Sequence, residues 1–321
     1  MKEILLTNKY SGRPLDIVKE EVPNGFRISF LPEQTQQALE ESVSETDYIL
    51  AGGRIKITFD VLERARHLAM IQRSGVGLDA LDLDAIRKKG IPLYVNQGVN
   101  TQSVAEHSLL LILACLRRLT AIHKNMVNGV WHKQEQGVQT SELMGKTVGI
   151  FGMGNVGQAL TRLLSPFRVR ILYTDQCRRE DIELESGVRF VSREQLLRES
   201  DIVSLNCALT PETKGIINAR SIAAMKPGAV LVNTARGSLV ETEALAEALK
   251  TGKLSFAGID VHETEPVPED YPLRNLENVI LTPHIAGVTE DSFRAMMHDA
   301  FRNIACFECG RLDEIEKYKY L

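Results

Sequence analysis

Three side chains in the second half of the chain could together bind a carboxylate and move a proton. Arg236, Glu265 and His284 each follow a short apolar run that predicts a β-strand. In open α/β sheets, ligands bind at the carboxyl ends of the strands. Oxidation of an alcohol beside a carboxylate requires a hydride acceptor, a base, a fixed cation and a group that tunes the base. The three segments offer one candidate each for the base, the fixed cation and the group that tunes the base.

A glycine-rich turn lies between a predicted strand at residues 147–151 and the helix that follows it. The turn reads Gly-Met-Gly-Asn-Val-Gly. The first glycine permits a tight turn, the second lets the backbone approach a pyrophosphate, and the third lets helix and strand pack closely. The helix N-terminus adds unpaired N–H groups and a partial positive charge. The pattern predicts a dinucleotide site at Gly152, Gly154, Asn155, Val156 and Gly157.

An acid ends the next predicted strand, at residues 169–174. Asp175 lies eighteen residues beyond Gly157, where a carboxylate can accept hydrogen bonds from the adenosine ribose and repel a 2′-phosphate. NAD is therefore favoured over NADP. Arg178 and Arg179 follow closely, and because an arginine near this position can accommodate a 2′-phosphate, tolerance of NADP stays open.

Further phrases are spaced along almost the whole chain. They are Val-Ala-Glu-His at 104–107, Gly-Lys-Thr-Val-Gly at 145–149, Leu-Thr-Pro-Glu-Thr at 209–213, Lys-Pro-Gly-Ala at 226–229 and Asn-Thr-Ala-Arg-Gly at 233–237. With the glycine turn, they resemble the D-isomer-specific 2-hydroxyacid dehydrogenases, which include D-3-phosphoglycerate, D-glycerate/glyoxylate and D-lactate dehydrogenases. Several phrases in one order are more specific than any one alone.

The resemblance implies an NAD-dependent enzyme that transfers a hydride between a small D-2-hydroxy acid and its 2-keto acid. It makes His284 the acid/base, pairs Glu265 with it, and assigns the carboxylate and keto oxygen of the substrate to Arg236. A carboxylate beside an imidazole stabilises the protonated ring, which can then deliver a proton. An arginine offers a fixed, charged fork that lysine would not reproduce.

Other site residues are also implied by the resemblance. The backbone of Val76 and Gly77 would receive the substrate carboxylate. Arg54 matches a phosphate-binding position, but Ile55 replaces the serine that usually follows, so 3-phosphoglycerate is only one option. The remaining implied cofactor contacts are Val104, Cys207, Thr213, Thr234, Ala235 and Asp260, the last at the nicotinamide end.

Short apolar runs alternate with helical stretches in two separate series, which predicts two parallel α/β sheets. The expected strands cover residues 4–6, 27–31, 48–51, 68–72, 92–95, 147–151, 169–174, 202–206, 230–233, 256–261 and 279–281. The resemblance implies two Rossmann-like domains, with a dinucleotide-binding domain at 99–285 inserted into a discontinuous, flavodoxin-like substrate domain at 1–98 plus 286–321.

A long apolar helix is expected between the two series. Ser103 and Glu106 suggest a capping box that opens it. The stretch from Leu109 to Leu116 is too apolar for water, so it must pack inside the chain or against a second copy. We therefore expect a homodimer built on this helix. A last helix is expected at residues 290–309.

Composition narrows the class of protein. The 38 basic and 42 acidic residues are interleaved, which gives no indication of nucleic acid binding. The longest apolar run is far short of the roughly 20 residues that cross a bilayer, and no secretory signal opens the chain. Five cysteines fit free thiols in the cytoplasm, and a lone Cys306/Cys309 pair without further ligands predicts no metal site.

Two other interpretations stay open. A co-repressor branch of the same family binds NAD and serves as a partner-binding scaffold, which the intact Arg236, Glu265 and His284 set disfavours. Phosphite dehydrogenases share the scaffold and are not separated by these residues. Formate dehydrogenases use a different set around the histidine, so Glu265 argues against them. His262 is expected to have a packing or supporting role. The five other histidines have no acid partner that the sequence can assign, and they are His67, His107, His123, His132 and His298.

Overall fold

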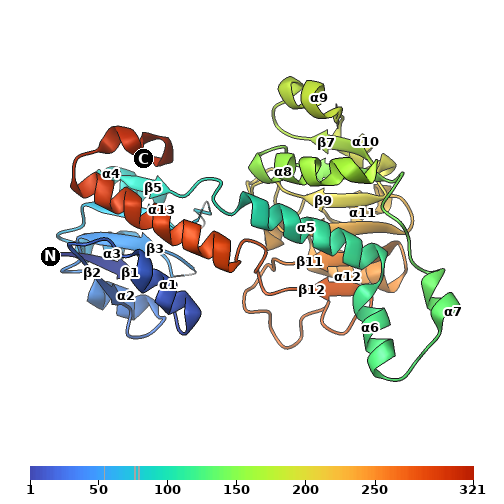
Figure 1. Cartoon of the computed structure of the whole chain (residues 1–321), viewed down its shortest axis with the longest axis horizontal. Helices are drawn as coiled ribbons and strands as arrows, with labels where there is room; N and C mark the ends of the chain where they lie inside the picture. Colours follow the sequence, from blue (N-terminus) through green and yellow to red (C-terminus); the bar gives the residue numbers. More distant parts are fainter. Residues whose placement is uncertain (54, 76, 79) are drawn as a thin grey trace. The chain divides into compact units, whose positions relative to one another are not determined.

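The computed structural model describes residues 1–53, 55–75, 77–78 and 80–321, so Arg54, Val76 and Asp79 lie outside the described residues. The chain divides into two compact units (Figure 1). Unit 1 comprises Met1–Asn100 and Val288–Leu321, and unit 2 comprises Thr101–Gly287. Each unit is built on one parallel sheet flanked by helices. The predicted fold class of two parallel α/β domains is confirmed.

Unit 1 contains a five-stranded parallel sheet of order β2-β1-β3-β4-β5. Its strands are β1 (Lys2–Leu6), β2 (Phe26–Phe30), β3 (Tyr48–Ala51), β4 (Met70–Arg73) and β5 (Leu93–Val95). Its helices are α1 (Arg13–Glu21), α2 (Gln36–Ser42), α3 (Phe59–Arg64), α4 (Leu83–Lys89) and α13 (Glu290–Glu308). Short 3-10 turns at Leu312–Glu314 and Glu316–Tyr318 follow α13.

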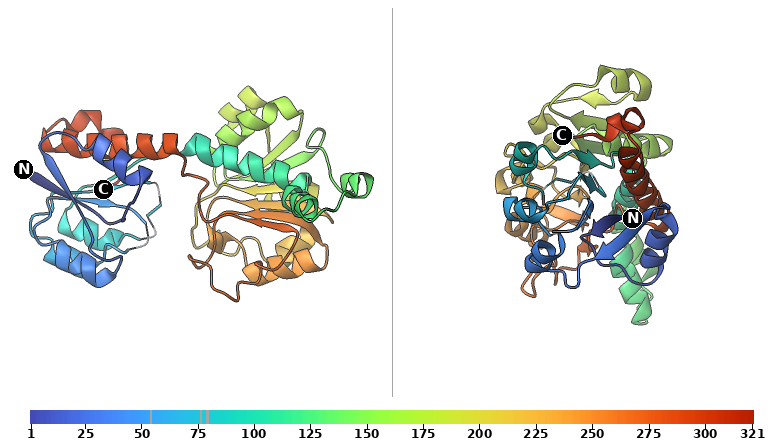
Figure 2. Two further views of the ribbon diagram at one scale, coloured as in Figure 1. Left: turned by 60° about the horizontal axis from the view of Figure 1, so that its bottom comes forward. Right: turned by 90° about the vertical axis from the view of Figure 1, so that its left-hand side faces the viewer.

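Both faces of this sheet are buried. Ile4 and Leu6 pack with α1 and α13, which lie side by side on one face (Figure 2), whereas Leu5 packs with α2, α3 and α4 on the other. This follows from the two-residue period of a strand. The chain end adds to the sheet, because Tyr320 donates its N–H to the carbonyl of Leu93 at 2.8 Å.

Unit 2 contains a seven-stranded parallel sheet of order β12-β11-β10-β9-β6-β7-β8. Its strands are β6 (Thr147–Phe151), β7 (Arg170–Thr174), β8 (Arg189–Phe190), β9 (Ile202–Leu205), β10 (Ala229–Asn233), β11 (Leu254–Ile259) and β12 (Val279–Leu281). The chain runs outward from β6 in one direction and returns to β9 on its other side. The crevice for a ligand is expected where the order reverses.

Helices cover both faces of this second sheet. α5 (Thr101–Leu116) and α8 (Asn155–Leu164) pack on one face with residues such as Val148 and Val230. The other face holds α10 (Arg193–Glu199), α11 (Ala219–Ala224) and α12 (Thr242–Lys250). The remaining elements are α6 (Leu119–Val127), α7 (Lys133–Gly137), α9 (Glu180–Ser186) and 3-10 turns at Ser165–Phe167 and Gly237–Leu239.

The long apolar helix differs from the sequence prediction at its start. α5 begins at Thr101, so Ser103 lies inside the first turn, and its buried Oγ has no hydrogen-bond partner among the described residues. The expected capping box was wrong, because a Ser103 cap would start the helix at residue 104 and the helix extends three residues further toward the N-terminus. Most of the apolar face is buried inside unit 2, while Leu110 is 53% exposed.

Two global features complete the description. In the described part of the chain, no helix combines the length and apolar character required to span a membrane. All five cysteines are free thiols.

Candidate active site

The glycine turn joins β6 to α8 and leaves space for a ligand. Gly152 has a φ of +93°, and a Cβ there would lie 2.8 Å from the backbone of Asn206 and Cys207. A Cβ on Gly157 would lie 2.2 Å from the Gly152 carbonyl oxygen, whereas one on Gly154 would meet nothing within 4 Å. The first and third glycines are therefore required by packing, and the second opens the surface. Gly154 caps α8 without a side-chain hydrogen bond, so the first N–H groups of the helix, from Asn155 onward, suit a pyrophosphate.

A carboxylate stands beside this turn. Asp175 follows β7, which pairs with β6. Its Oδ2 accepts a hydrogen bond from the N–H of Met153 at 2.6 Å, and its Oδ1 accepts one from Gln176 at 2.6 Å. These bonds fix the position of the carboxyl group next to the phosphate-binding turn, as a ribose-binding acid requires. The residues present fit an NAD molecule.

The other implied cofactor residues occupy several neighbouring loops. Cys207 is half-buried beside Gly152, and burial raises the pKa of its thiol to about 11. Thr234 is buried and its hydroxyl lies 2.7 Å from that of Ser108 in α5. The hydroxyl of Thr213 donates to the carbonyl of its own turn, at Ala208. Contacts of these residues with a cofactor stay predictions.

The loop that carries Arg236 approaches the loop after β11 closely at Gly237. The side chain of Asn233 donates to the Arg236 carbonyl at 2.9 Å and accepts from Ala235 at 3.1 Å, which fixes the turn after β10. A Cβ on Gly237 would lie 2.0 Å from the carbonyl carbon of His262. Only a glycine therefore lets the arginine loop approach the loop that carries Glu265.

His284 and Glu265 form the pair that the resemblance implied. Nδ1 of His284 lies 2.9 Å and 3.0 Å from the two carboxylate oxygens. The Glu265 side chain is 18% exposed and that of His284 is 45% exposed. The histidine has a φ of 56°, an uncommon conformation for a residue with a Cβ, so the surrounding loop must hold it in place.

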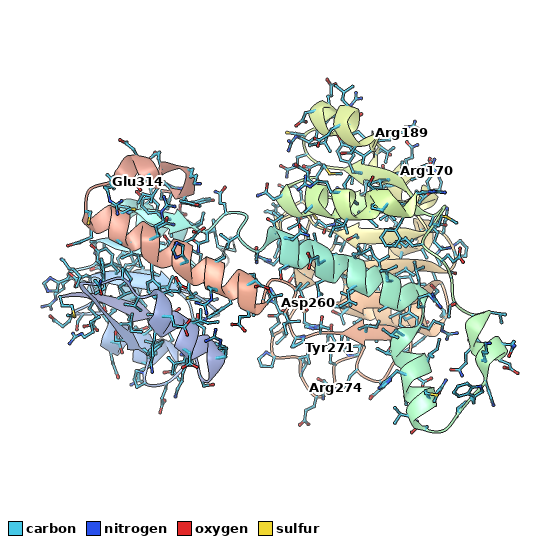
Figure 3. All side chains as sticks on the ribbon, in the orientation of Figure 1. Arg170, Arg189, Asp260, Tyr271, Arg274 and Glu314 are labelled. Carbon is cyan, nitrogen blue, oxygen red and sulfur yellow. The ribbon has the colours of Figure 1, made fainter. Side chains whose placement is uncertain are left out.

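Asp260, which follows β11, supplies that restraint (Figure 3). It is fully buried, and its carboxylate accepts hydrogen bonds from the N–H groups of Ile285 and Ala286, both at 2.9 Å, and from the Thr282 hydroxyl at 2.5 Å. Its carbonyl accepts from the N–H of His284 at 2.7 Å. The loop that carries the histidine is thus bound to Asp260 on both sides of that residue. A contact between Asp260 and nicotinamide stays a prediction.

Two other histidines support the same loop. Nε2 of His107 lies 3.1 Å from the Thr282 hydroxyl and 3.7 Å from Asp260, an acid partner that the sequence could not assign. Its place in the phrase at residues 104–107 was the available signal. The ring nitrogens of His262 lie 3.0 Å from the Tyr271 hydroxyl and 3.0 Å from the Thr282 carbonyl, which is a supporting position.

Some predicted residues lie elsewhere or outside the description. Gly77 belongs to unit 1, where its carbonyl accepts a hydrogen bond from Nε of Arg73 at 2.7 Å. Val76 and Arg54 are outside the described residues. His298, in α13, pairs with Glu21 at 3.0 Å, a partner that the sequence did not reveal. Within the described ranges, no group of three or more His, Cys, Asp or Glu side chains is arranged to hold a metal ion.

A cavity of about 310 Å³ lies at the opposite edge of the unit 2 sheet. It is lined by residues near the amino ends of β6, β9 and β10, among them Lys146, Asp201 and Lys226. None of the residues predicted to act in catalysis or cofactor binding lines it. The candidate site is therefore the carboxyl edge, where the loops converge.

Comparison with known proteins agrees with this geometry. Residues 109–286, more than half of the chain, match the family model described as D-isomer specific 2-hydroxyacid dehydrogenase, NAD binding domain. The chain belongs to this family. As a member, it is an NAD-dependent oxidoreductase, and the predictions of family, enzyme class and cofactor are confirmed.

Relatives from this 2-hydroxyacid dehydrogenase family cover nearly the full length. The chain is 36% identical to a glyoxylate reductase from Korarchaeum cryptofilum, over 93% of this chain and 87% of the relative. It is 37% identical to a hydroxypyruvate reductase from Thermotoga maritima, over 78% and 81%. The structure is similar to that of D-lactate dehydrogenase from Aquifex aeolicus complexed with NAD and lactic acid, with a TM-score of 0.86, 29% identity, and coverage of 99% and 98%.

Proposed function

We propose that this protein reduces a small 2-keto acid, such as glyoxylate or hydroxypyruvate, to the corresponding D-2-hydroxy acid. Support for the substrate class comes from its relatives, which are named glyoxylate reductase and hydroxypyruvate reductase. The observation that carries the proposed chemistry is the contact of 2.9 Å between His284 and Glu265, since it places an imidazole with a carboxylate partner at the carboxyl edge where a proton is needed.

The proposed mechanism assigns one task to each side chain. Glu265 holds Nδ1 of His284 and stabilises the imidazolium, so that Nε2 faces the substrate and donates its proton to the keto oxygen as that oxygen gains negative charge. When bound, NADH supplies the hydride to the carbonyl carbon. Arg236 binds the substrate carboxylate and polarises the keto oxygen. In the reverse direction, neutral His284 removes the hydroxyl proton.

The proposal assigns further substrate contacts to residues of unit 1. The family resemblance assigns the substrate carboxylate to the backbone of Val76 and Gly77 and a phosphate-binding position to Arg54, and the proposal carries these roles over. They keep hydroxypyruvate and its phosphate in the substrate set.

A substrate panel tests this function. NADH oxidation is measured with glyoxylate, hydroxypyruvate, pyruvate and 3-phosphohydroxypyruvate, and NADH formation with D- and L-glycerate, D- and L-lactate, phosphite and formate. We expect turnover of 2-keto acids and of D-isomers only. A preference for L-isomers, oxidation of phosphite or formate without 2-keto acid reduction, or NAD binding without any turnover would each overturn the proposal, the last in favour of a partner-binding scaffold.

The proposal includes a cytoplasmic homodimer. α6 and α7 have no buried residues, and the segment from α5 to residue 144 leaves several large apolar side chains exposed, whose cover a second copy would provide. These residues are Leu110, Leu119, Met126, Val127, Trp131, Val138 and Met144. Sedimentation should give a dimer, and replacing Val127 and Trp131 by serine should give monomers. A wild-type chain that sediments as a monomer would contradict this assignment.

A further inference from the structure

Two arginines follow the acid that ends β7, and both are held by the helix after them. Arg178 and Arg179 stand three and four residues beyond Asp175, where a guanidinium could neutralise the 2′-phosphate of NADP. Instead, both side chains donate to carboxylates in the first turn of α9. The arginines are therefore already paired before any dinucleotide binds.

The pair between Arg178 and Glu183 is bidentate. Nε donates to one carboxylate oxygen and Nη2 to the other, both at 2.9 Å. Glu183 is only 16% exposed and also accepts from the hydroxyl of Tyr173 at 2.8 Å, while the ring of Tyr173 is fully buried. The hydrogen bond from Arg178 holds the pKa of Glu183 below its ordinary value. A parallel fork on an anchored carboxylate is better defined than most surface ion pairs.

The pair between Arg179 and Asp181 completes the arrangement. Its Nε and Nη2 donate to the two oxygens of Asp181 at 3.1 and 2.9 Å. The backbone N–H of Arg179 donates to the Tyr173 hydroxyl at 2.8 Å, so this buried phenol links both arginines to α9. The hydrogen bond from Arg179 holds the pKa of Asp181 below its ordinary value.

We propose that Asp181 and Glu183 are specificity-determining residues, which exclude NADP by holding Arg179 and Arg178 in ion pairs on α9. The stretch from Asp175 to Glu183 then contains four carboxylates against two guanidiniums. A 2′-phosphate, with about −1.5 to −2 charges, meets net negative charge in this stretch, where both guanidiniums are already paired. The ribose hydroxyls of NAD need only Asp175.

Substitution of Asp175 alone should not give a protein that binds NADP well. This expectation distinguishes the proposal from one in which a single acid excludes NADP. Its carboxylate repels the phosphate, but its loss leaves both arginines paired. NADP binding should improve only when the acids on α9 are also neutralised. The effects of the two changes are therefore expected to be non-additive.

The test measures dinucleotide binding without substrate, so its outcome is independent of the proposed reaction. NADH and NADPH are titrated by nicotinamide fluorescence into the wild-type protein and into three variants: Asp175→Ser, Asp181→Asn with Glu183→Gln, and all three changes together. We expect Asp175→Ser to weaken the binding of NADH about tenfold and to increase the affinity for NADPH only slightly. In the triple variant, NADPH should bind about tenfold more tightly than in Asp175→Ser, because the freed arginines can then form charge-assisted bonds.

Two controls distinguish an effect of the ion pairs on NADPH affinity from an effect of overall charge. Glu185→Gln removes one carboxylate from the exposed side of the same helix and should change NADPH affinity by less than about twofold in the Asp175→Ser background. Adding Arg178→Gln and Arg179→Gln to the triple variant should abolish its gain. Unchanged NADPH affinity in the triple variant, an equal gain from Glu185→Gln, or a gain that survives the loss of both arginines would overturn the proposal. Retained NADH binding establishes that each variant is folded.

Discussion

The carboxyl edge of the unit 2 sheet has two halves that are built by different means. On the β6–β7 half, the backbone makes the site: Gly152 turns at a positive φ, Gly154 leaves open space, and α8 presents its N-terminus. On the β10–β12 half, side chains on loops make the site, and Asp260 holds the loop of His284 in an uncommon conformation. The β6–β7 half is suited to bind a dinucleotide through its shape and the partial charges of its backbone. The β10–β12 half positions side chains that can exchange a proton or polarise a substrate bond.

This difference implies that binding and chemistry can be separated by substitution. Changes to Arg236 or His284 in the β10–β12 half should reduce turnover and leave dinucleotide affinity intact. Changes in the β6–β7 half should reduce dinucleotide affinity first. The predictions below test that division.

The largest effect is expected for His284→Gln. Glutamine cannot shuttle the proton, so kcat should fall about a thousandfold, while the Kd for NADH stays within about twofold because the glycine turn is untouched. Steady-state rates and fluorescence titration measure the two quantities. His298→Gln, at an exposed ion pair with Glu21 in unit 1, is the matched control and should retain full rate. Loss of NADH binding together with turnover would break the proposed separation.

Arg236→Lys should cost about a hundredfold in kcat/KM for the 2-keto acid. Lysine keeps the positive charge but loses the planar fork that suits a carboxylate. NADH affinity should again be retained, and the matched control is Arg274→Lys, where the exposed arginine side chain donates to the carbonyl of Glu269. A kcat/KM within about threefold of wild type would show that Arg236 does not bind the carboxylate.

The two halves also differ in how far the sequence predicts them. The glycine turn was predictable residue by residue, because its chemistry depends on local backbone and on the fixed spacing to Asp175. Strands such as β3, β6 and β12 were predicted with their observed bounds, since short buried strands appear as apolar runs between turn residues.

The support of His284 was not predictable in the same way. His107 is 175 residues away from Thr282, and the two meet only after α5 packs on the sheet. Periodicity carries no information about such a contact. The start of α5 was missed for a related reason. Ser103 fitted a capping pattern, but the helix begins earlier, at Thr101, so the local capping preference of Ser103 did not decide where the helix starts.

Two glycine variants should separate fold from function within the β6–β7 half. Gly157→Ala places a Cβ 2.2 Å from the Gly152 carbonyl oxygen, so the backbone must shift. We expect about 1–3 kcal/mol of destabilisation and about tenfold weaker NADH binding. Gly154→Ala meets no atom within 4 Å, so thermal unfolding should be nearly unchanged while NADH binding weakens, because the new methyl group enters the space assigned to the pyrophosphate. Unaltered NADH affinity in Gly154→Ala would remove that assignment.

The smallest effect is expected at Cys207, which adjoins the glycine turn without supplying its chemistry. Burial raises the pKa of this thiol to about 11, so at pH 8 only about one molecule in a thousand carries the reactive thiolate. Iodoacetamide should therefore modify the exposed Cys177 and Cys309 first, with Cys207 slower by about a hundredfold, and its rate should rise as the pH approaches 11. Cys207→Ser should change NADH affinity by less than about twofold. Rapid alkylation of Cys207 at pH 8 that NADH blocks would show instead that a reactive side chain contributes to the backbone-built half of the site.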